Sequence, residues 1–269
     1  YKLSGENATD FPRVPTVSDG YSVNMSSDIL LKAISNTIFA TSNDELRPAM
    51  TGVFLKLDES SATFVATDSH RLIRYRRVDV VSDMAHSMII PRKALTLLKA
   101  TLPTETTNVA VEFNTSNAFF DFNRIKMICR LIDERYPDYE NVIPADNQNN
   151  MIIGKGEFLS SLKRIAIYAN KTTHQVRLKI TGSELLISSE DLDFSNEASE
   201  RLVCEHEGED IEIGFNAKFL IEMIGNINAD QITLKLNAPN RAGLLVPSTK
   251  EGSEDILMLV MPVMLNNYV

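Results

Sequence analysis

An internal repeat limits what this chain can fold into more strongly than any other feature of its sequence. Residues 27–41 carry Leu30, Ile34 and Ile38 at helical spacing, and residues 156–171 carry a matching apolar stripe about 128 positions later. Two shorter amphipathic helices are expected at 91–102 and 216–227, about 125 positions apart. Since a repeat of this length sets the architecture of a whole chain, the sequence predicts two copies of one structural unit.

The segments between the predicted helices alternate apolar and polar residues or are rich in β-branched residues, which is typical of strands. Such segments lie at 51–57, 62–68 and 71–78 in the first copy and at 176–181, 184–190 and 198–206 in the second. Each copy therefore contains two strand-helix-strand-strand-strand units, and the predicted fold class is α+β with two similar domains of about 115 residues. The helices are expected to share one face, with Asp28 as the N-cap of the first.

Composition and charge exclude several classes of protein. The 269 residues are 43% apolar, which excludes a disordered chain, and a formal charge of −9 disfavours a uniformly basic nucleic-acid binder. Cys129 and Cys204 stand apart without metal-binding spacing, so neither a disulfide framework nor a zinc site is indicated, and a reducing, cytoplasmic compartment is expected. No apolar run reaches the ~18 residues that span a bilayer. The scattered carboxylates predict no metal, and no cofactor is implied.

Positive charge gathers in the predicted helices, whereas acidic residues crowd the segments 190–200 and 205–212. The basic helix residues are Lys32, Arg92, Lys93, Lys99, Lys155, Lys163, Arg164, Lys171 and Lys218. An acidic protein can thus present a moderately basic helical surface. On composition alone, a merely solvated helix face is the simpler interpretation.

The densest polar cluster is VATDSHRL at residues 65–72, and it allows a catalytic and a structural interpretation. In an extended segment Ser69 faces away from Asp68 and His70, so these three side chains cannot form a proton-transfer line. The alternative is a turn in which Asp68 accepts hydrogen bonds from backbone amides and Arg71 pairs with a carboxylate. The sequence favours the turn.

The run DILMLVMPVML at residues 255–265 is almost wholly apolar and predicts a final buried strand. Pro262 cannot donate a ladder hydrogen bond, so it confines that stretch to a sheet edge or a strand end. We therefore expect Val260, Met261, Val263 and Met264 to be partly exposed at the margin of a sheet. Exposed methionine-rich surface suits adaptable binding of partner peptides.

Five motifs occur in the order and spacing of one protein family. They are VATDSHRL at 65–72, IIPRKAL at 89–95, RYPDY at 135–139, IGFNAKFL at 213–220 and VMPVML at 260–265. With them the chain resembles the second and third of the three domains of the bacterial DNA polymerase III beta sliding clamp family, over nearly its whole length.

The resemblance implies a DNA-clamp fold, with helices on the inner face and sheets outside. It places the tail of an N-terminal clamp domain and a linker at 1–20, with residues 1–12 as the end of a strand. The middle domain would occupy 21–139, a linker 140–150 and the C-terminal domain 151–269.

The resemblance also implies a non-enzymatic processivity factor. In this family two chains form a head-to-tail homodimeric ring around duplex DNA, which they bind without sequence preference. The implied DNA-facing residues are Lys32, Arg92, Lys93, Lys99, Lys163, Arg164 and Lys218, and the implied dimer-interface residues are Ile167, Tyr168, Glu190 and Asp191. Because ring closure in relatives uses a first domain, this chain is expected to be mainly monomeric.

A groove between the two domains binds short linear peptides in relatives, from the DNA polymerase III alpha subunit, the clamp loader, other polymerases and repair proteins. The implied walls are Met50, Thr67, His70, Arg71, Leu72, Pro137, Val142, Asn216, Phe219, Leu259, Val260, Met261, Pro262, Val263, Met264 and Leu265. Ser69 stands where relatives often have glycine, so the preferred peptide is expected to differ.

Two other functions stay open at this point. One is a peptide-binding interaction module that does not encircle DNA. The other is a hydrolase that uses His70.

Overall fold

The computed structural model describes residues 1–11, 13, 15–16, 20–250 and 252–265. Two halves of the chain repeat one order of elements. The first half contains β1 (Tyr21–Ser26), α1 (Ser27–Thr37), β2 (Gly52–Leu57), β3 (Ala62–Thr67), β4 (Arg71–Arg77), β5 (His86–Pro91), α2 (Arg92–Thr101), β6 (Asn108–Phe113), β7 (Asn117–Phe122) and β8 (Ile125–Arg130).

The second half follows the same plan, with one additional short strand, β13, before its last unit. It contains β9 (Asn149–Gly154), α3 (Lys155–Ile165), β10 (Gln175–Thr181), β11 (Glu184–Asp191), β12 (Asn196–Val203), β13 (Glu205–Glu207), β14 (Ile211–Asn216), α4 (Ala217–Asn226), β15 (Gln231–Leu236), β16 (Gly243–Pro247) and β17 (Glu254–Val260). The predicted α+β repeat of strand-helix-strand-strand-strand units is confirmed.

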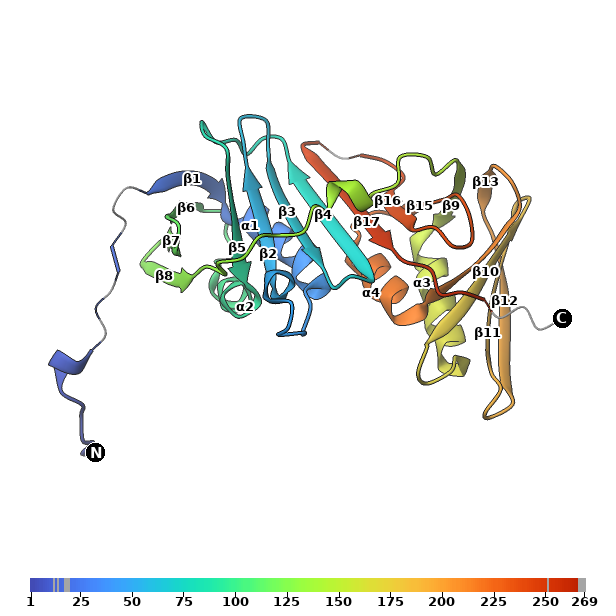
Figure 1. The fold of residues 1–269 in the computed structure, drawn as a ribbon, viewed down its shortest axis with the longest axis horizontal. Helices are drawn as coiled ribbons and strands as arrows, with labels where there is room; N and C mark the ends of the chain where they lie inside the picture. Colours follow the sequence, from blue (N-terminus) through green and yellow to red (C-terminus); the bar gives the residue numbers. More distant parts are fainter. Residues whose placement is uncertain (12, 14, 17–19, 251, 266–269) are drawn as a thin grey trace.

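The strands form three antiparallel sheets, and the largest crosses the boundary between the halves. Its nine strands have the order β13-β9-β15-β16-β17-β4-β3-β2-β5, and two four-stranded sheets have the orders β1-β6-β7-β8 and β12-β11-β10-β14. The boundary is the β4–β17 pair, which runs from Arg77 opposite Glu254 to Arg71 opposite Val260. Figure 1 shows the two halves side by side, joined where β4 lies next to β17.

The helices pack on the sheets through one apolar stripe each, as the sequence pattern predicts. Leu30 and Ile34 of α1, Leu98 of α2, and Phe158 of α3 and Leu220 of α4 are buried in one continuous core. α1 contacts α2, and α3 contacts α4, so the helices lie in two adjacent pairs. The basic side chains on their opposite faces are exposed, except that of Lys155, which is partly buried and donates to the Ile227 carbonyl; Lys171 lies beyond the end of α3.

The start of the first helix differs from the expectation. Ser26, not Asp28, occupies the N-cap position of α1, and it makes no side-chain capping hydrogen bond. Asp28 lies inside the first helical turn, where its negative charge is stabilised by the helix dipole. The Ser27 hydroxyl instead donates to the Glu105 carbonyl, at 3.2 Å, which ties this end of the helix to the loop before β6.

The two ends of the chain also depart from their predicted form. Residues 1–11 form no strand and contain one 3-10 turn at Ala8–Asp10; residues 12, 14 and 17–19 of the predicted N-terminal segment lie outside the described residues. At the other end, Val260 is fully buried, because its side chain faces the core shared with the helices. The expectation that Val260 is partly exposed is therefore wrong.

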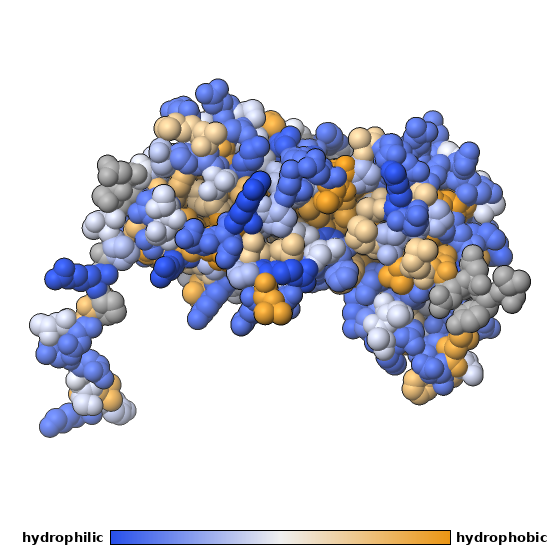
Figure 2. All heavy atoms as spheres, viewed as in Figure 1, coloured by the Kyte–Doolittle hydropathy of each residue, from blue (hydrophilic) through white to orange (hydrophobic). Residues whose placement is uncertain are grey.

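The face shown in Figure 2 is mainly hydrophilic. Hydrophobic side chains form separate patches on it, several of them over the middle of the molecule. No helix in the described part is long and apolar enough to cross a membrane. Within the same residues, no group of three or more His, Cys, Asp or Glu side chains is placed to hold a metal ion.

Candidate functional site

The turn between β3 and β4, residues 67–71, lies at the junction of the two halves and is organised by Asp68. One carboxylate oxygen of Asp68, Oδ1, accepts hydrogen bonds from the backbone N–H groups of His70 and Arg71, both at 3.0 Å. Ser69 adopts a left-handed conformation, with φ of 75°, and its N–H donates to the Thr67 hydroxyl. These contacts confirm the structural interpretation of this segment, in which Asp68 closes a turn.

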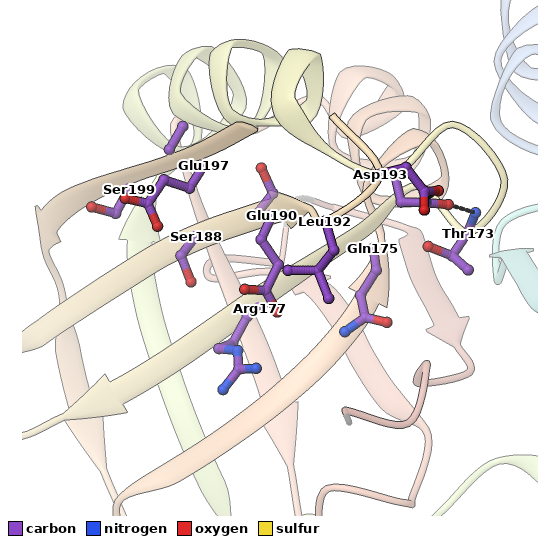
Figure 3. Close-up of a pocket in the computed structure, with 12 residues that line it drawn as sticks. Thr173, Gln175, Arg177, Ser188, Glu190, Leu192, Asp193, Glu197 and Ser199 are labelled. Carbon is purple, nitrogen blue, oxygen red and sulfur yellow. Dashed lines mark hydrogen bonds between the residues drawn. The ribbon is translucent and has the colours of Figure 1, made fainter. Parts of the chain in front are cut away.

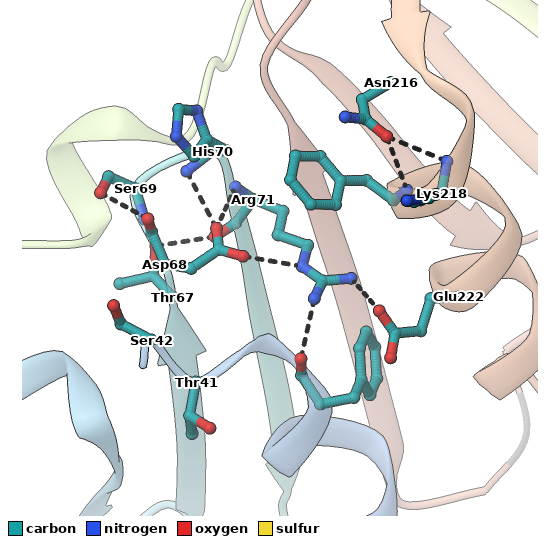
Figure 4. Close-up of polar contacts among 12 residues, drawn as sticks. Thr41, Ser42, Thr67, Asp68, Ser69, His70, Arg71, Asn216, Lys218 and Glu222 are labelled. Atoms are coloured by element: carbon teal, nitrogen blue, oxygen red, sulfur yellow. Dashed lines mark hydrogen bonds and ion pairs between the residues drawn. The ribbon is translucent and has the colours of Figure 1, made fainter. Parts of the chain in front are cut away.

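Arg71 carries a charge from this turn into the other half of the molecule (Figure 4). Its guanidinium donates to Oδ2 of Asp68 at 3.1 Å, to Oε2 of Glu222 on α4 at 2.7 Å, and to the Phe39 carbonyl at 2.8 Å. The residue is only 6% exposed. A buried guanidinium with three accepting partners, two of them carboxylates, is a satisfied arrangement, so Arg71 is positioned by the fold.

Two aromatic rings, those of Phe39 and Phe219, lie near the Arg71 guanidinium, and the ring of the adjacent residue His70 stacks on Phe219. The guanidinium carbon lies 4.8 Å from the ring centroid of Phe219 and 5.3 Å from that of Phe39, on opposite halves of the junction. The His70 ring stacks on Phe219, with centroids 6.0 Å apart and planes at 21°. Aromatic and cationic groups at these separations attract one another beyond simple burial. The turn and α4 are therefore joined by a mixed polar and aromatic contact.

The C-terminal run passes directly beside this contact. The Met261 N–H donates to the His70 carbonyl at 2.8 Å, and the Val263 N–H donates to the Gly214 carbonyl at 2.8 Å. These two bonds fix the backbone on either side of Pro262, which itself has no N–H. Met261 and Met264 stay exposed, whereas Leu259 is buried.

Gly214 offers the first test of this anchoring. A Cβ built on Gly214 would lie 2.5 Å from the Val263 carbonyl oxygen and 2.8 Å from Cδ2 of Leu265. We expect Gly214→Ala to lower the free energy of unfolding by about 1–3 kcal/mol, because the run must shift to make room. Chemical denaturation measures this. The control is Gly225→Ala on α4, where a Cβ meets nothing within 4 Å and the stability should be equal or higher. Equal stability of both variants would contradict the anchoring.

The structure divides the sequence-predicted groove residues by exposure. Thr67, Arg71, Leu72, Leu259 and Val260 are buried; Met50, Asn216, Phe219, Pro262, Val263 and Leu265 are partly exposed; His70, Pro137, Val142, Met261 and Met264 are exposed. Of this set, only the partly exposed and exposed residues offer side chains to a ligand. Met264 and Leu265 line a separate cavity of about 430 Å³ with Asn149, Ile211 and Pro239. The C-terminal end of the run therefore turns away from residues 67–71.

The Asn216 side chain makes hydrogen bonds at the start of α4. Its side-chain oxygen caps α4 by accepting from the backbone N–H groups of Lys218 and Phe219, and its amide donates to the Thr173 carbonyl at 3.3 Å. An asparagine at this position satisfies donors that the first helical turn leaves free. The cap fixes the start of α4 and with it the position of Phe219.

The segment after β8 covers the outer face of the junction. Phe54 stacks on Tyr136, with centroids 4.7 Å apart, and the Tyr136 hydroxyl donates to the Val65 carbonyl at 3.4 Å. Burial, followed by the charge of Glu140, raises the pKa of Tyr139 to about 12, so its ring stays neutral in the apolar cluster. Two tyrosines from RYPDY thereby anchor the segment that presents Pro137 and Val142.

The predicted DNA-facing residues are all exposed, but not all of their charges are free. Lys32 pairs with Glu254 at 2.8 Å, and Arg164 makes two hydrogen bonds to Glu200. Glu200 raises the pKa of Arg164, and Arg164 lowers that of Glu200. Lys93, Lys99, Lys163 and Lys218 make no ion pair among the described residues. Arg92 donates to the Asn43 side chain at 2.6 Å.

Two lysines lie near His174 at the N-terminal end of α4. Burial lowers the pKa of His174, and the nearby Lys218 and Lys171 lower it further. Lysines that disfavour a protonated histidine mark a local excess of positive charge in an acidic protein.

The predicted dimer-interface residues fall into two groups. Ile167 and Tyr168 are exposed, and Glu190 lines a polar hollow of about 740 Å³ on β10 to β12 (Figure 3). Asp191 is only 2% exposed, and its carboxylate accepts from the Asp193 N–H and contacts the Asn170 amide. Asp191 therefore closes the turn after β11, and its buried side chain is not available for the dimer interface at which it was expected.

Sequence reasoning did not identify Glu222 or Phe39, which both contact Arg71. Their roles depend on how α4 and the end of α1 are rotated against β4, which no local pattern records. The paired tyrosines of RYPDY did carry a signal, since two aromatic residues in a proline-containing linker indicate an anchored segment.

Comparisons with known proteins agree with this architecture. Residues 24–138 match the family model of the DNA polymerase III beta subunit central domain, and residues 140–263 match that of its C-terminal domain. The beta sliding clamp of Bacillus subtilis is 28% identical over 266 residues, covering 98% of this chain and 70% of the relative. That of Synechococcus elongatus is 28% identical over 275 residues, covering 99% and 72%.

Solved structures give the same result. A crystal structure of the Bacillus subtilis DNA polymerase sliding clamp superposes with a TM-score of 0.90 at 27% identity, covering 97% of this chain and 68% of that one. The Pseudomonas aeruginosa sliding clamp bound to griselimycin superposes with a TM-score of 0.89 at 27% identity, covering 96% and 69%.

Proposed function

Because this chain belongs to the DNA polymerase III beta subunit family, we propose that it acts as a sliding clamp, a processivity factor that tethers a polymerase to duplex DNA. One observation carries the proposal. The turn 67–71 and the C-terminal run, about 190 residues apart in sequence, are joined by the hydrogen bond from Met261 to His70 at the boundary between the two matched domains.

The proposed peptide site is the surface at this boundary. His70, Phe219 and Met261 offer ring and thioether surface, and the buried Arg71 and Leu72 support it from beneath. Such a surface suits a short linear peptide with Leu and Phe side chains, whose Gln finds main-chain groups nearby. Affinity in the micromolar range, about 8 kcal/mol, is expected of so small an interface. The proposed partners are the polymerase alpha subunit, the clamp loader, other polymerases and repair proteins.

The proposed DNA surface is the face of the helices. Exposed lysine and arginine side chains on α2, α3 and α4 attract phosphates without reading bases, which allows the protein to move along the duplex. In this proposal the ring is a head-to-tail homodimer, and residues 21–139 and 151–269 act as a middle and a C-terminal clamp domain. The chain supplies binding surfaces and no catalytic step.

Salt dependence of DNA binding tests the helical face. We expect Arg92→Ala combined with Lys93→Ala to reduce the slope of log K against log salt by about 2, since each lost phosphate contact contributes about 0.9. The measurement is anisotropy of a labelled duplex titrated with the 269-residue chain at a series of salt concentrations, beginning at low salt. A matched double variant, Arg124→Ala with Lys126→Ala near the β7–β8 turn, should keep the slope. An unchanged slope in the first variant would favour the interaction module that does not encircle DNA.

A further inference from the structure

The contact between the two halves at α4 depends on one acidic residue, Glu222. Its carboxylate receives the Arg71 guanidinium at 2.7 Å, and about half of its side chain is exposed. Arg71 in turn belongs to the first half, where Asp68 and the Phe39 carbonyl hold it. Glu222 is therefore the point at which α4 is fixed electrostatically to the turn 67–71.

Glu222 and Phe219 share one face of α4, because residues three positions apart in a helix are neighbours. A rotation of α4 that breaks the Arg71–Glu222 pair would also move the Phe219 ring away from His70, on which it now stacks. The guanidinium itself packs against Phe219 at 4.8 Å. The Arg71–Glu222 ion pair and the His70–Phe219 stack therefore both depend on the same position of α4.

Arg71 is poorly placed to touch a ligand. It is 6% exposed, and each of its three side-chain nitrogens already donates to an acceptor within 3.1 Å. His70 and Met261, by contrast, are exposed on the same surface. A guanidinium in this position can act on a bound peptide only through the residues that it orients.

We propose that Arg71 and Glu222 form an interdomain clasp that holds Phe219 against His70 and thereby presets the peptide surface before a peptide binds. Both are positioning residues. This inference rests on the proposed function, because it names the device that arranges the same surface. A preset surface spares a peptide the free-energy cost of ordering its binding site.

The test replaces Glu222 with glutamine, which keeps the shape and removes the charge. We expect a fluorescently labelled Gln-x-x-Leu-x-Phe peptide to bind Glu222→Gln about tenfold more weakly than the wild-type chain. The control is Glu184→Gln. Glu184 has the same side-chain exposure of 47% and pairs with Arg201, but it lies on β11 away from the junction. It should change the affinity by less than about twofold.

A second readout separates positioning from general loss of structure. The ring protons of His70 feel the ring current of Phe219, so their NMR resonances should move in Glu222→Gln and stay in place in Glu184→Gln. The denaturation midpoint of Glu222→Gln should remain close to wild type, because the pair is partly exposed.

Unchanged affinity in Glu222→Gln, or weakened affinity with unmoved His70 resonances, would overturn the clasp. Failure of the wild-type chain to bind the peptide at all would overturn the proposed function instead. If the His70 resonances then still moved in Glu222→Gln, Arg71 and Glu222 would be an interdomain contact without a role in peptide binding.

Discussion

Replacing Met261 with aspartate is expected to weaken binding of a Gln-x-x-Leu-x-Phe peptide by at least about thirtyfold, which corresponds to about 2 kcal/mol. Met261 is 43% exposed, and its backbone is fixed by the hydrogen bond to His70. Its thioether therefore stands at a defined place on the proposed peptide surface. A carboxylate there would have to be desolvated against the Leu and Phe side chains of the peptide.

Met84 provides the matched control for this experiment. It is 52% exposed and lies in the segment between β4 and β5, which follows the end of β4 opposite to the turn 67–71. Met84→Asp makes the same chemical change on a similarly exposed methionine, so its peptide affinity should stay within about twofold. Equal affinities for the two variants, with both chains folded, would remove Met261 from the site.

Arg71→Ala is expected to cause the largest loss of stability, lowering the free energy of unfolding by about 3 kcal/mol. The substitution removes a buried guanidinium and leaves the Phe39 carbonyl without its donor. It also opens a gap between Phe39 and Phe219. The loss stays below that of a fully buried ion pair because Glu222 can be solvated once it is released.

Chemical denaturation measures this prediction, with two further variants for comparison. Arg71→Lys keeps the charge but cannot reach three acceptors with a planar fork, so an intermediate loss is expected. Arg201→Ala removes an exposed arginine that pairs with Glu184, and it should change stability by less than about 0.5 kcal/mol. If Arg71→Ala were as stable as Arg201→Ala, the junction would not depend on this side chain.

The repeat and most of its elements could be predicted from the sequence because they leave local patterns. Period-2 alternation predicted β2, β3 and β4, and helical spacing predicted the four helices, although α1 and α3 end four and six residues earlier than the predicted ranges. The nine-stranded sheet could not be predicted in this way. Pairing of β17 with β4 joins segments about 180 residues apart, and such pairing depends on tertiary packing.

Two residues are more deeply buried than expected. Val260 was expected to be partly exposed at a sheet margin and Asp191 to lie at a dimer interface, yet both side chains are buried. In a strand the face alternates at every residue, so a small error in register exchanges buried and exposed positions. Asp191 is buried at low cost because it accepts a turn hydrogen bond from Asp193.

Glu222 illustrates a different limit. Nothing in the sequence around α4 distinguishes this glutamate from others on solvated helix faces. Its importance appears only when α4 is seen against the turn that holds Arg71 (Figure 4). Residues that join domains are thus harder to predict than residues that belong to a contiguous motif such as VATDSHRL.

The most direct measurement is fluorescence anisotropy of a labelled Gln-x-x-Leu-x-Phe peptide titrated with the wild-type chain. A second peptide with alanine in place of Leu and Phe serves as control. The account predicts saturable binding in the micromolar range, displaced by unlabelled peptide, and at least about tenfold weaker binding of the alanine peptide. Absence of saturable binding by the folded chain, or equal binding of both peptides, would contradict the assignment of the domain junction as a peptide site.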